Sequence, residues 1–150
     1  MTAGRVLGVD HGSRRTGLAL SDPSRTIANP LEVIEGGEPA ALQRIVDLVS
    51  EREVGEVVVG LPLNMDGTIG PQGRAALGFA ERLAARLTVP VGTWDERLTS
   101  VQADQALAPA ERGKKARRPT REDVLERRDK VAASILLQSW LDARGRHPPS

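Results

Sequence analysis

The chain has 150 residues, of which 39% are hydrophobic and 27% charged, and its formal net charge is only +1. This length suits one compact domain over residues 1–150 and excludes a two-lobed ATPase or a TIM barrel. No apolar run reaches the roughly 18 residues of a membrane span, and no signal-peptide core precedes the first strand-like run. Because the chain has no cysteine, disulfides, thiolate metal sites and cysteine nucleophiles are excluded. We expect a soluble, cytoplasmic domain.

The first third of the chain predicts three strands followed by a helix. Residues 5–10 and 16–21 are short apolar runs separated by a polar turn, which is typical of an antiparallel hairpin. Residues 26–34 predict a weaker strand, which Pro30 should confine to a sheet edge or break with a bulge. Residues 40–52 carry apolar side chains at helical spacing.

The middle of the chain alternates between strands and helices. Residues 56–61 are almost wholly apolar, the pattern of a strand buried on both faces. A loop over residues 62–73 leads to a predicted helix over residues 74–87, and residues 89–95 predict another strand. The apolar stripe of that helix is expected to comprise Leu77, Ala80, Leu83, Ala84 and Leu87.

The chain ends in a basic segment and a long helix. Residues 112–121 carry six of the 21 basic side chains and no acid, which suits contact with a polyanion but equally describes a solvated, flexible loop. A helix is expected over residues 121–143, and residues 145–150 predict a frayed tail. Three strands followed by alternating helices and strands predict an α/β fold: a five-stranded mixed sheet, part antiparallel meander and part parallel, flanked by helices.

Acidic residues stand at the ends of two predicted strands and on the last helix. Asp10 closes the first strand, and Asp95 and Glu96 close the fifth. Because ligands bind beyond the carboxyl ends of parallel strands, these carboxylates converge if their strands lie close together. Asp129 shares a helix face with Ala133, whose small side chain allows the helix to approach the sheet closely. Each acid alone is also explained by a turn cap or an ion pair; the three together indicate a site.

The ligand chemistry of such a site favours hard divalent cations. Three carboxylates, no cysteine and only two histidines favour Mg²⁺ or Mn²⁺. Two such ions about 3.5–4 Å apart can activate water and stabilise the leaving oxygen during phosphodiester cleavage. Other site types are not indicated, since the sequence has no GxxxxGK[ST] phosphate loop and no HExxH motif. His11 and Asp10 are adjacent in a strand and point to opposite faces, so they make a poor dyad.

Four segments match the motifs of one family in the family's order: GVDHGSRRTGLA (residues 8–19), VGLPLNMDG (59–67), DERLTS (95–100) and DKVAASIL (129–136). They extend over nearly the whole chain, which resembles the YqgF/RuvX family of pre-16S rRNA nucleases, also called Holliday-junction-resolvase-like proteins. The resemblance implies an RNase H-like fold with an acidic, divalent-metal site. By motif position, it also implies that Asp10, Glu96 and Asp129 are the catalytic and metal-binding acids.

Candidate nucleic-acid contacts surround these acids. The polar groups of the loop after the fourth strand could position a phosphate, although a tight turn shaped by glycine and proline explains that loop equally well. The arginines at the tip of the first hairpin either contact backbone phosphates or are solvated turn residues. The expected nucleic-acid-binding residues are Arg14, Arg15, Asn64, Arg97, Lys114, Lys115, Arg117 and Arg118.

The leading hypothesis is a metal-dependent endonuclease that hydrolyses a phosphodiester in structured nucleic acid. The resemblance points to the 5′ end of precursor 16S rRNA as the substrate. The alternatives are cleavage of four-way DNA junctions, or a non-catalytic factor that binds RNA or a transcription complex. A junction resolvase requires a two-fold dimer; the sequence has no decisive dimerisation element, so we expect a monomer or a weak homodimer. Like charges facing a polyanion argue against a pure binding factor.

Overall fold

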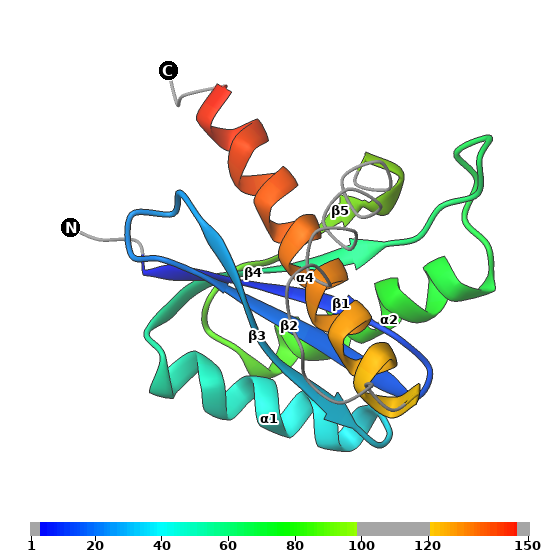
Figure 1. Ribbon diagram of the computed structural model, residues 1–150, viewed down its shortest axis with the longest axis horizontal. Helices are drawn as coiled ribbons and strands as arrows, with labels where there is room; N and C mark the ends of the chain where they lie inside the picture. Colours follow the sequence, from blue (N-terminus) through cyan, green and yellow to red (C-terminus); the bar gives the residue numbers. More distant parts are fainter. Residues whose placement is uncertain (1–3, 99–120, 147–150) are drawn as a thin grey trace, which may run out of the picture.

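The computed structural model describes residues 4–98 and 121–146, with the side chains of the last helix described from Lys130 to Arg144. A five-stranded sheet lies between two layers of helices (Figure 1). A short 3₁₀ helix, η1 (Glu96–Leu98), follows the fifth strand. The other elements are, in chain order, β1 (Arg5–His11), β2 (Arg15–Ser21), β3 (Ala28–Glu35), α1 (Glu38–Glu51), β4 (Val54–Leu61), α2 (Pro71–Arg86), β5 (Val91–Asp95) and α4 (Arg121–Arg146).

The sheet combines antiparallel and parallel strands in the order β3-β2-β1-β4-β5. β2 pairs antiparallel with both β1 and β3, whereas β4 pairs parallel with both β1 and β5. This arrangement confirms the predicted mixed sheet. Because β1, β4 and β5 run in the same direction, their carboxyl ends lie at one end of the sheet. Asp10 and Asp95 therefore lie at that same end.

Pro30 lies in an edge strand, as the sequence predicts. β3 forms one edge of the sheet. Its pairing with β2 shifts from Leu18–Glu32 to Ala19–Pro30, which produces a bulge. Proline has no N–H to donate to a neighbouring strand, so it is tolerated at an edge or a bulge.

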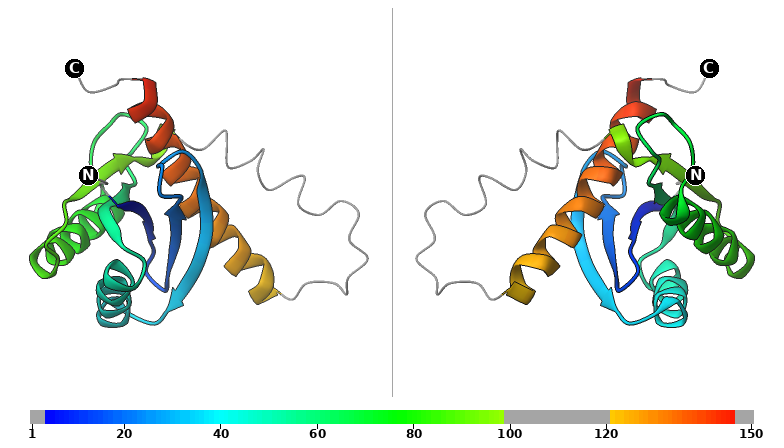
Figure 2. Two further views of the ribbon diagram at one scale, coloured as in Figure 1. Left: turned by 90° about the vertical axis from the view of Figure 1, so that its left-hand side faces the viewer. Right: turned by 90° about the vertical axis from the view of Figure 1, so that its right-hand side faces the viewer.

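The alternation of side chains along β1 divides the hydrophobic core into two parts. Leu7 and Val9 belong to the cluster under α1 and α2, whereas Val6 belongs to the cluster that Leu137 and Trp140 of α4 share. Figure 2 shows the same division, with α1 and α2 on one face of the sheet and α4 on the other. By the same alternation, Asp10 lies on the α4 face of β1.

Gly8 sets how closely α4 approaches β1. A Cβ atom at Gly8 would lie 2.8 Å from the Cβ of Leu137 and 3.4 Å from the carbonyl oxygen of Ala133. Both of these α4 residues are fully buried. α4 therefore passes directly over β1, and its N-terminal half lies toward the end of the sheet at which β1 finishes (Figure 1).

The helix boundaries differ from the predicted ones at α2 and α4. α2 begins at Pro71 rather than at residue 74, because a proline in the first turn lacks only an N–H that would have no helical partner there. α4 runs to Arg146 instead of ending at residue 143. The buried stripe of α2 consists of Gly73, Ala76, Phe79, Ala80 and Leu83, so the predicted stripe was wrong in including the exposed Leu77 and Ala84. In the part of the chain described, no helix is long and apolar enough to cross a bilayer.

An ion pair ties the edge strand β3 to α1. The Nε and one terminal nitrogen of Arg44 each donate to a Glu32 carboxylate oxygen at 2.9 Å. The hydrogen bond from Arg44 holds the pKa of the Glu32 carboxyl below its usual value of 4.5, against a smaller opposing effect of burial. A carboxyl with a lowered pKa in the folded state contributes stability above its unfolded pKa and loses it as the pH falls through the folded pKa.

The Glu32→Gln variant is therefore expected to be less stable than the native chain at pH 7, and the difference should shrink as the pH is lowered toward 3. Since both side chains are about one third exposed, the difference at pH 7 should be no more than about 1 kcal/mol. Urea unfolding at both pH values measures it. A difference of the same size at pH 3 would show that the charge of Glu32 contributes nothing.

Candidate active site

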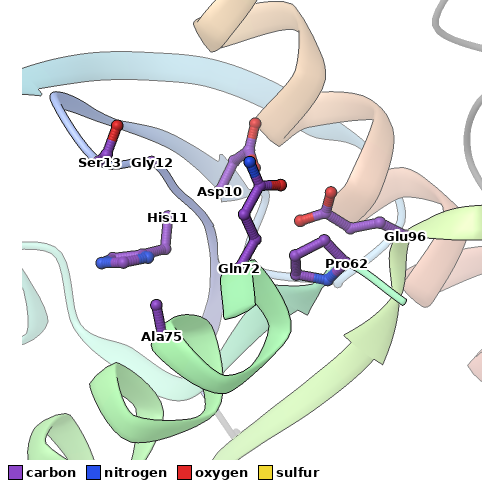
Figure 3. Close-up of a pocket in the computed structure, with 8 residues that line it drawn as sticks. All are labelled: Asp10, His11, Gly12, Ser13, Pro62, Gln72, Ala75 and Glu96. Atoms are coloured by element: carbon purple, nitrogen blue, oxygen red, sulfur yellow. The ribbon is translucent and has the colours of Figure 1, made fainter. Parts of the chain in front are cut away.

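Asp10 and Glu96 meet at the carboxyl end of the parallel strands. Asp10 precedes the last residue of β1, and Glu96 opens η1 directly after β5. Their carboxyl groups are hydrogen-bonded to one another and point into the same space in Figure 3. That space is a cavity of about 360 Å³, whose other walls are His11, Gly12, Ser13, Pro62, Gln72 and Ala75.

The position of Glu96 depends on the missing side chain of Gly60 in β4. A Cβ atom at Gly60 would lie only 3.0 Å from both the Cγ and the Cδ of Glu96. The fifth strand ends at Asp95, as the sequence predicts, and the chain then turns into η1 at Glu96. This turn carries the Glu96 side chain back over β4, where only a glycine leaves room for it.

The environment of Glu96 disfavours its negative charge. Burial raises the pKa of the Glu96 carboxyl above its usual value; the hydrogen bond with Asp10 lowers it, and the negative charge of Asp95 raises it further. Two carboxylates that face one another at short range also repel when both are charged. A bound divalent cation would reverse this preference by stabilising both charged forms. Two hard oxygen donors beside an open cavity fit such an ion.

Asp95, the neighbour of Glu96, has a different role. Both of its carboxylate oxygens accept hydrogen bonds from Arg97, whose terminal nitrogen lies 2.7 Å from one of them. The hydrogen bond from the Arg97 guanidinium lowers the pKa of the Asp95 carboxyl, more than its slight burial raises it. Asp95 is thus ion-paired with Arg97 within its own turn, and Glu96 is the acid that reaches the cavity.

His11 lies on the opposite side of β1 from Asp10, as the sequence predicts. Its ring packs against Phe79 of α2, with ring centres 4.6 Å apart. Burial lowers the pKa of His11; the Glu38 carboxylate opposes this effect and the charge of Arg82 adds to it. His11 therefore forms an uncharged wall of the cavity at neutral pH, on the side away from the acid pair (Figure 3).

The third predicted acid, Asp129, lies in α4, but its side chain is outside the described residues. Its position in the helix is one turn before the buried Ala133, which packs over β1. Among the described side chains, no group of three potential metal ligands comes together. The predicted basic contacts Lys114, Lys115, Arg117 and Arg118 also lie outside the described residues.

The other predicted nucleic-acid contacts are distributed around the cavity. Arg14 is exposed in the β1–β2 turn, next to the cavity wall, and Arg15 begins β2 and is half-buried. Asn64 is exposed, but its side-chain amide donates to the Thr68 hydroxyl at 2.9 Å. Arg97 donates to Asp95 and to the backbone carbonyl of Met65.

Sequence reasoning missed two features of this site. Gly60 supports Glu96, and a glycine within an otherwise apolar strand is itself a signal of close approach by another group. Gln72, the second residue of α2, projects toward Asp10 in the cavity (Figure 3). No local pattern singles out Gln72, because its place depends on where α2 packs against the sheet.

A family model described as "RuvX: Holliday junction resolvase" matches residues 4–143. The chain belongs to the RuvX family. A RuvX relative from Chloroflexus aggregans is 48% identical over 140 residues, which cover 93% of this chain and 94% of the relative. Another, from Desulforudis audaxviator, is 43% identical over 141 residues, covering 93% of this chain and 95% of the relative. Both relatives are named as pre-16S rRNA nucleases, so the predicted family is confirmed.

Solved structures confirm the predicted fold class of this RuvX chain. Thermus thermophilus RuvC in complex with a Holliday junction substrate superposes with a TM-score of 0.56 at 21% identity, covering 96% of this chain and 97% of that one. The yeast mitochondrial Holliday junction resolvase Ydc2 gives a TM-score of 0.52 at 8% identity, covering 97% and 80%. These similarities establish the RNase H-like architecture expected from the sequence. Family membership supports a hydrolase that acts on phosphodiester bonds of nucleic acid.

Proposed function

We propose that this RuvX protein is a divalent-metal-dependent endonuclease whose reaction takes place in the Asp10–Glu96 cavity. The observation that carries the proposal is the meeting of these two half-buried carboxyls beside a cavity at the carboxyl end of the parallel strands. Two half-buried carboxyls that face one another carry an electrostatic cost that a bound cation removes. The relatives named as pre-16S rRNA nucleases support the same class of reaction.

We propose that Asp10 and Glu96 hold Mg²⁺ or Mn²⁺, in one or two sites, and that Asp129 provides the third carboxylate. A bound divalent cation supplies Lewis-acid activation of water and stabilisation of charge on the phosphate. The missing side chain of Gly60 leaves room for the Glu96 side chain over β4. Asp95 does not reach the cavity, because it is ion-paired with Arg97. Gln72 and Ser13 add neutral polar groups to the cavity wall, where they suit phosphate or sugar oxygens.

We propose precursor 16S rRNA as the substrate, acted on in the cytoplasm by a monomer or weak homodimer formed from a single domain. Arg14 and Arg15 beside the cavity, together with the basic residues Lys114, Lys115, Arg117 and Arg118, would contact the phosphate backbone. The description of the family model favours a second candidate, cleavage of four-way DNA junctions. A resolvase would have to act as a two-fold dimer, because two strands must be cut symmetrically.

The two candidates differ in the substrate that is cut. The purified protein is incubated with a precursor 16S rRNA 5′ leader or with a four-way DNA junction, each with Mg²⁺, with Mn²⁺ and with EDTA. Site-specific cleavage of the RNA that EDTA abolishes is the expected result. Cleavage of the junction alone would replace the rRNA proposal with the resolvase. Tight binding without metal-dependent cleavage of either substrate would contradict the nuclease proposal.

A further inference from the structure

The loop between β4 and α2 presents one fully exposed hydrophobic side chain. Met65 is 93% exposed, compared with 57% or less for the other exposed large hydrophobic residues in the described part of the chain. Figure 1 shows this loop extending beyond the body of the domain from the end of β4. Single exposed apolar residues are common on protein surfaces, so exposure alone does not mark Met65 as a binding residue. The residues around it decide this.

The loop is held in one conformation by its own hydrogen bonds. Leu63 and Ile69 form an isolated antiparallel bridge across its base. Within it, the Asn64 N–H donates to the Thr68 carbonyl at 2.9 Å, and the Gly67 N–H donates to the Asn64 carbonyl at 2.8 Å. Met65 therefore stands at the tip of a fixed turn, so that little conformational entropy of the backbone is lost when a ligand packs against it.

Arg97 connects this turn to the end of β5. Its guanidinium donates to the Met65 carbonyl at 3.2 Å while it pairs with Asp95. Arg97 immediately follows Glu96 in η1, and the loop itself starts at Pro62, which lines the acid cavity. The tip of the loop is thus coupled at both ends to the residues that surround the acid pair.

The charged side chains near the tip are held by hydrogen bonds and an ion pair within the loop and η1. Asp66 accepts hydrogen bonds from the N–H and the hydroxyl of Thr68, at 3.0 and 2.7 Å, and Asp95 is paired with Arg97. Since the arginine is occupied, the tip offers an apolar thioether surface rather than a cation for a phosphate. Such a surface suits the flat face of a nucleobase, and methionine is one of the apolar side chains that proteins insert against bases.

We propose that Met65 packs against an unpaired nucleobase of the nucleic-acid substrate, next to the bond that is cut, and that Arg97 is the residue that positions it. This inference rests on the proposed nuclease function and adds to it a contact that holds the substrate strand beside the acids. Because every base has an apolar face, the contact tolerates different sequences but requires an unpaired or unstacked base.

The test measures base stacking separately from cleavage. Substrates carry 2-aminopurine, a base whose fluorescence reports stacking, in turn at the unpaired positions within two nucleotides of the mapped cleavage site. Native Met65, Met65→Ala and Met65→Leu are compared in the Asp10→Asn background, which binds without cutting. Ile27→Ala is the matched control, since Ile27 is 55% exposed in the turn after β2, at the opposite end of the sheet.

For Met65→Ala, we expect about fivefold to tenfold weaker binding and loss of the fluorescence change at one position. Met65→Leu should restore both, and Ile27→Ala should alter neither. If Met65→Ala binds as tightly as the parent with the same fluorescence change, the loop inference fails while the nuclease proposal stands. If the parent binds neither RNA leader nor DNA junction, the proposed function fails and the inference fails with it.

Discussion

Replacing Asp10 with asparagine is expected to lower the rate of phosphodiester cleavage by roughly 10³-fold or more. The amide cannot supply the negative oxygen that holds a divalent cation against Glu96, and the lost stabilisation of several kcal/mol corresponds to a factor of this size. The fold should survive, because the substitution also removes the repulsion between two facing carboxyls. The measurement is the single-turnover cleavage rate at saturating enzyme, together with the thermal unfolding midpoint.

A control substitution shows whether the loss of activity in Asp10→Asn comes from the metal site or from the loss of any one carboxylate. Asp47→Asn removes one carboxylate from α1, where Asp47 accepts a hydrogen bond from Gln43, on the opposite face of the sheet from the acid pair. We expect native activity for this variant. Cleavage by Asp10→Asn within tenfold of the native rate would contradict the assignment of Asp10 as a metal-binding acid.

Gly60→Ala is expected to lower the cleavage rate by about 10²-fold, with little change in substrate affinity. The added methyl group would occupy space 3.0 Å from the Cγ and Cδ of Glu96, and the carboxyl must move away from Asp10 to relieve this contact. Displacement of a catalytic group by about 1 Å can cost a factor of this size. Because a flexible carboxyl end can move aside, the fold itself should be affected much less than the rate.

The neighbouring strand provides the control for this prediction. A Cβ atom at Gly92 in β5 would meet nothing within 4 Å, so Gly92→Ala makes the same change in open space. It should leave the rate and the unfolding midpoint nearly unchanged. Equal cleavage rates for the two alanine variants would show that the position of Glu96 does not depend on Gly60.

The regular part of the fold could be predicted from local patterns. The apolar runs of β1 and β4, the edge placement of β3 with its bulge at Pro30, and the mixed sheet all follow from periodicity and proline chemistry. Asp10 could be placed at the end of β1 for the same reason. The meeting of Asp10 with Glu96 was also predicted, because carboxyl ends of parallel strands share one end of a sheet.

The remainder of the site depends on contacts between distant residues. Whether Glu96 continues β5 or leaves it depends on the room that Gly60 provides, 36 positions earlier in the chain. The role of Arg97 likewise depends on a carbonyl acceptor 32 residues away. The buried stripe of α2 shifts from Leu77 to Ala76 and Phe79 because the sheet, and not the helix alone, decides which face is covered.

We propose that a divalent cation held by Asp10 and Glu96 contacts the scissile phosphate. The most direct test of this proposal is the cleavage of substrates in which one non-bridging oxygen of that phosphate is replaced by sulfur, as separate stereoisomers. Mg²⁺ binds sulfur poorly, whereas the softer Mn²⁺ accepts it better. We predict that one isomer is cut far more slowly than the oxygen substrate in Mg²⁺ and recovers in Mn²⁺. If sulfur slows cleavage equally in Mg²⁺ and in Mn²⁺ for both isomers, no cation at Asp10 and Glu96 contacts either of these phosphate oxygens.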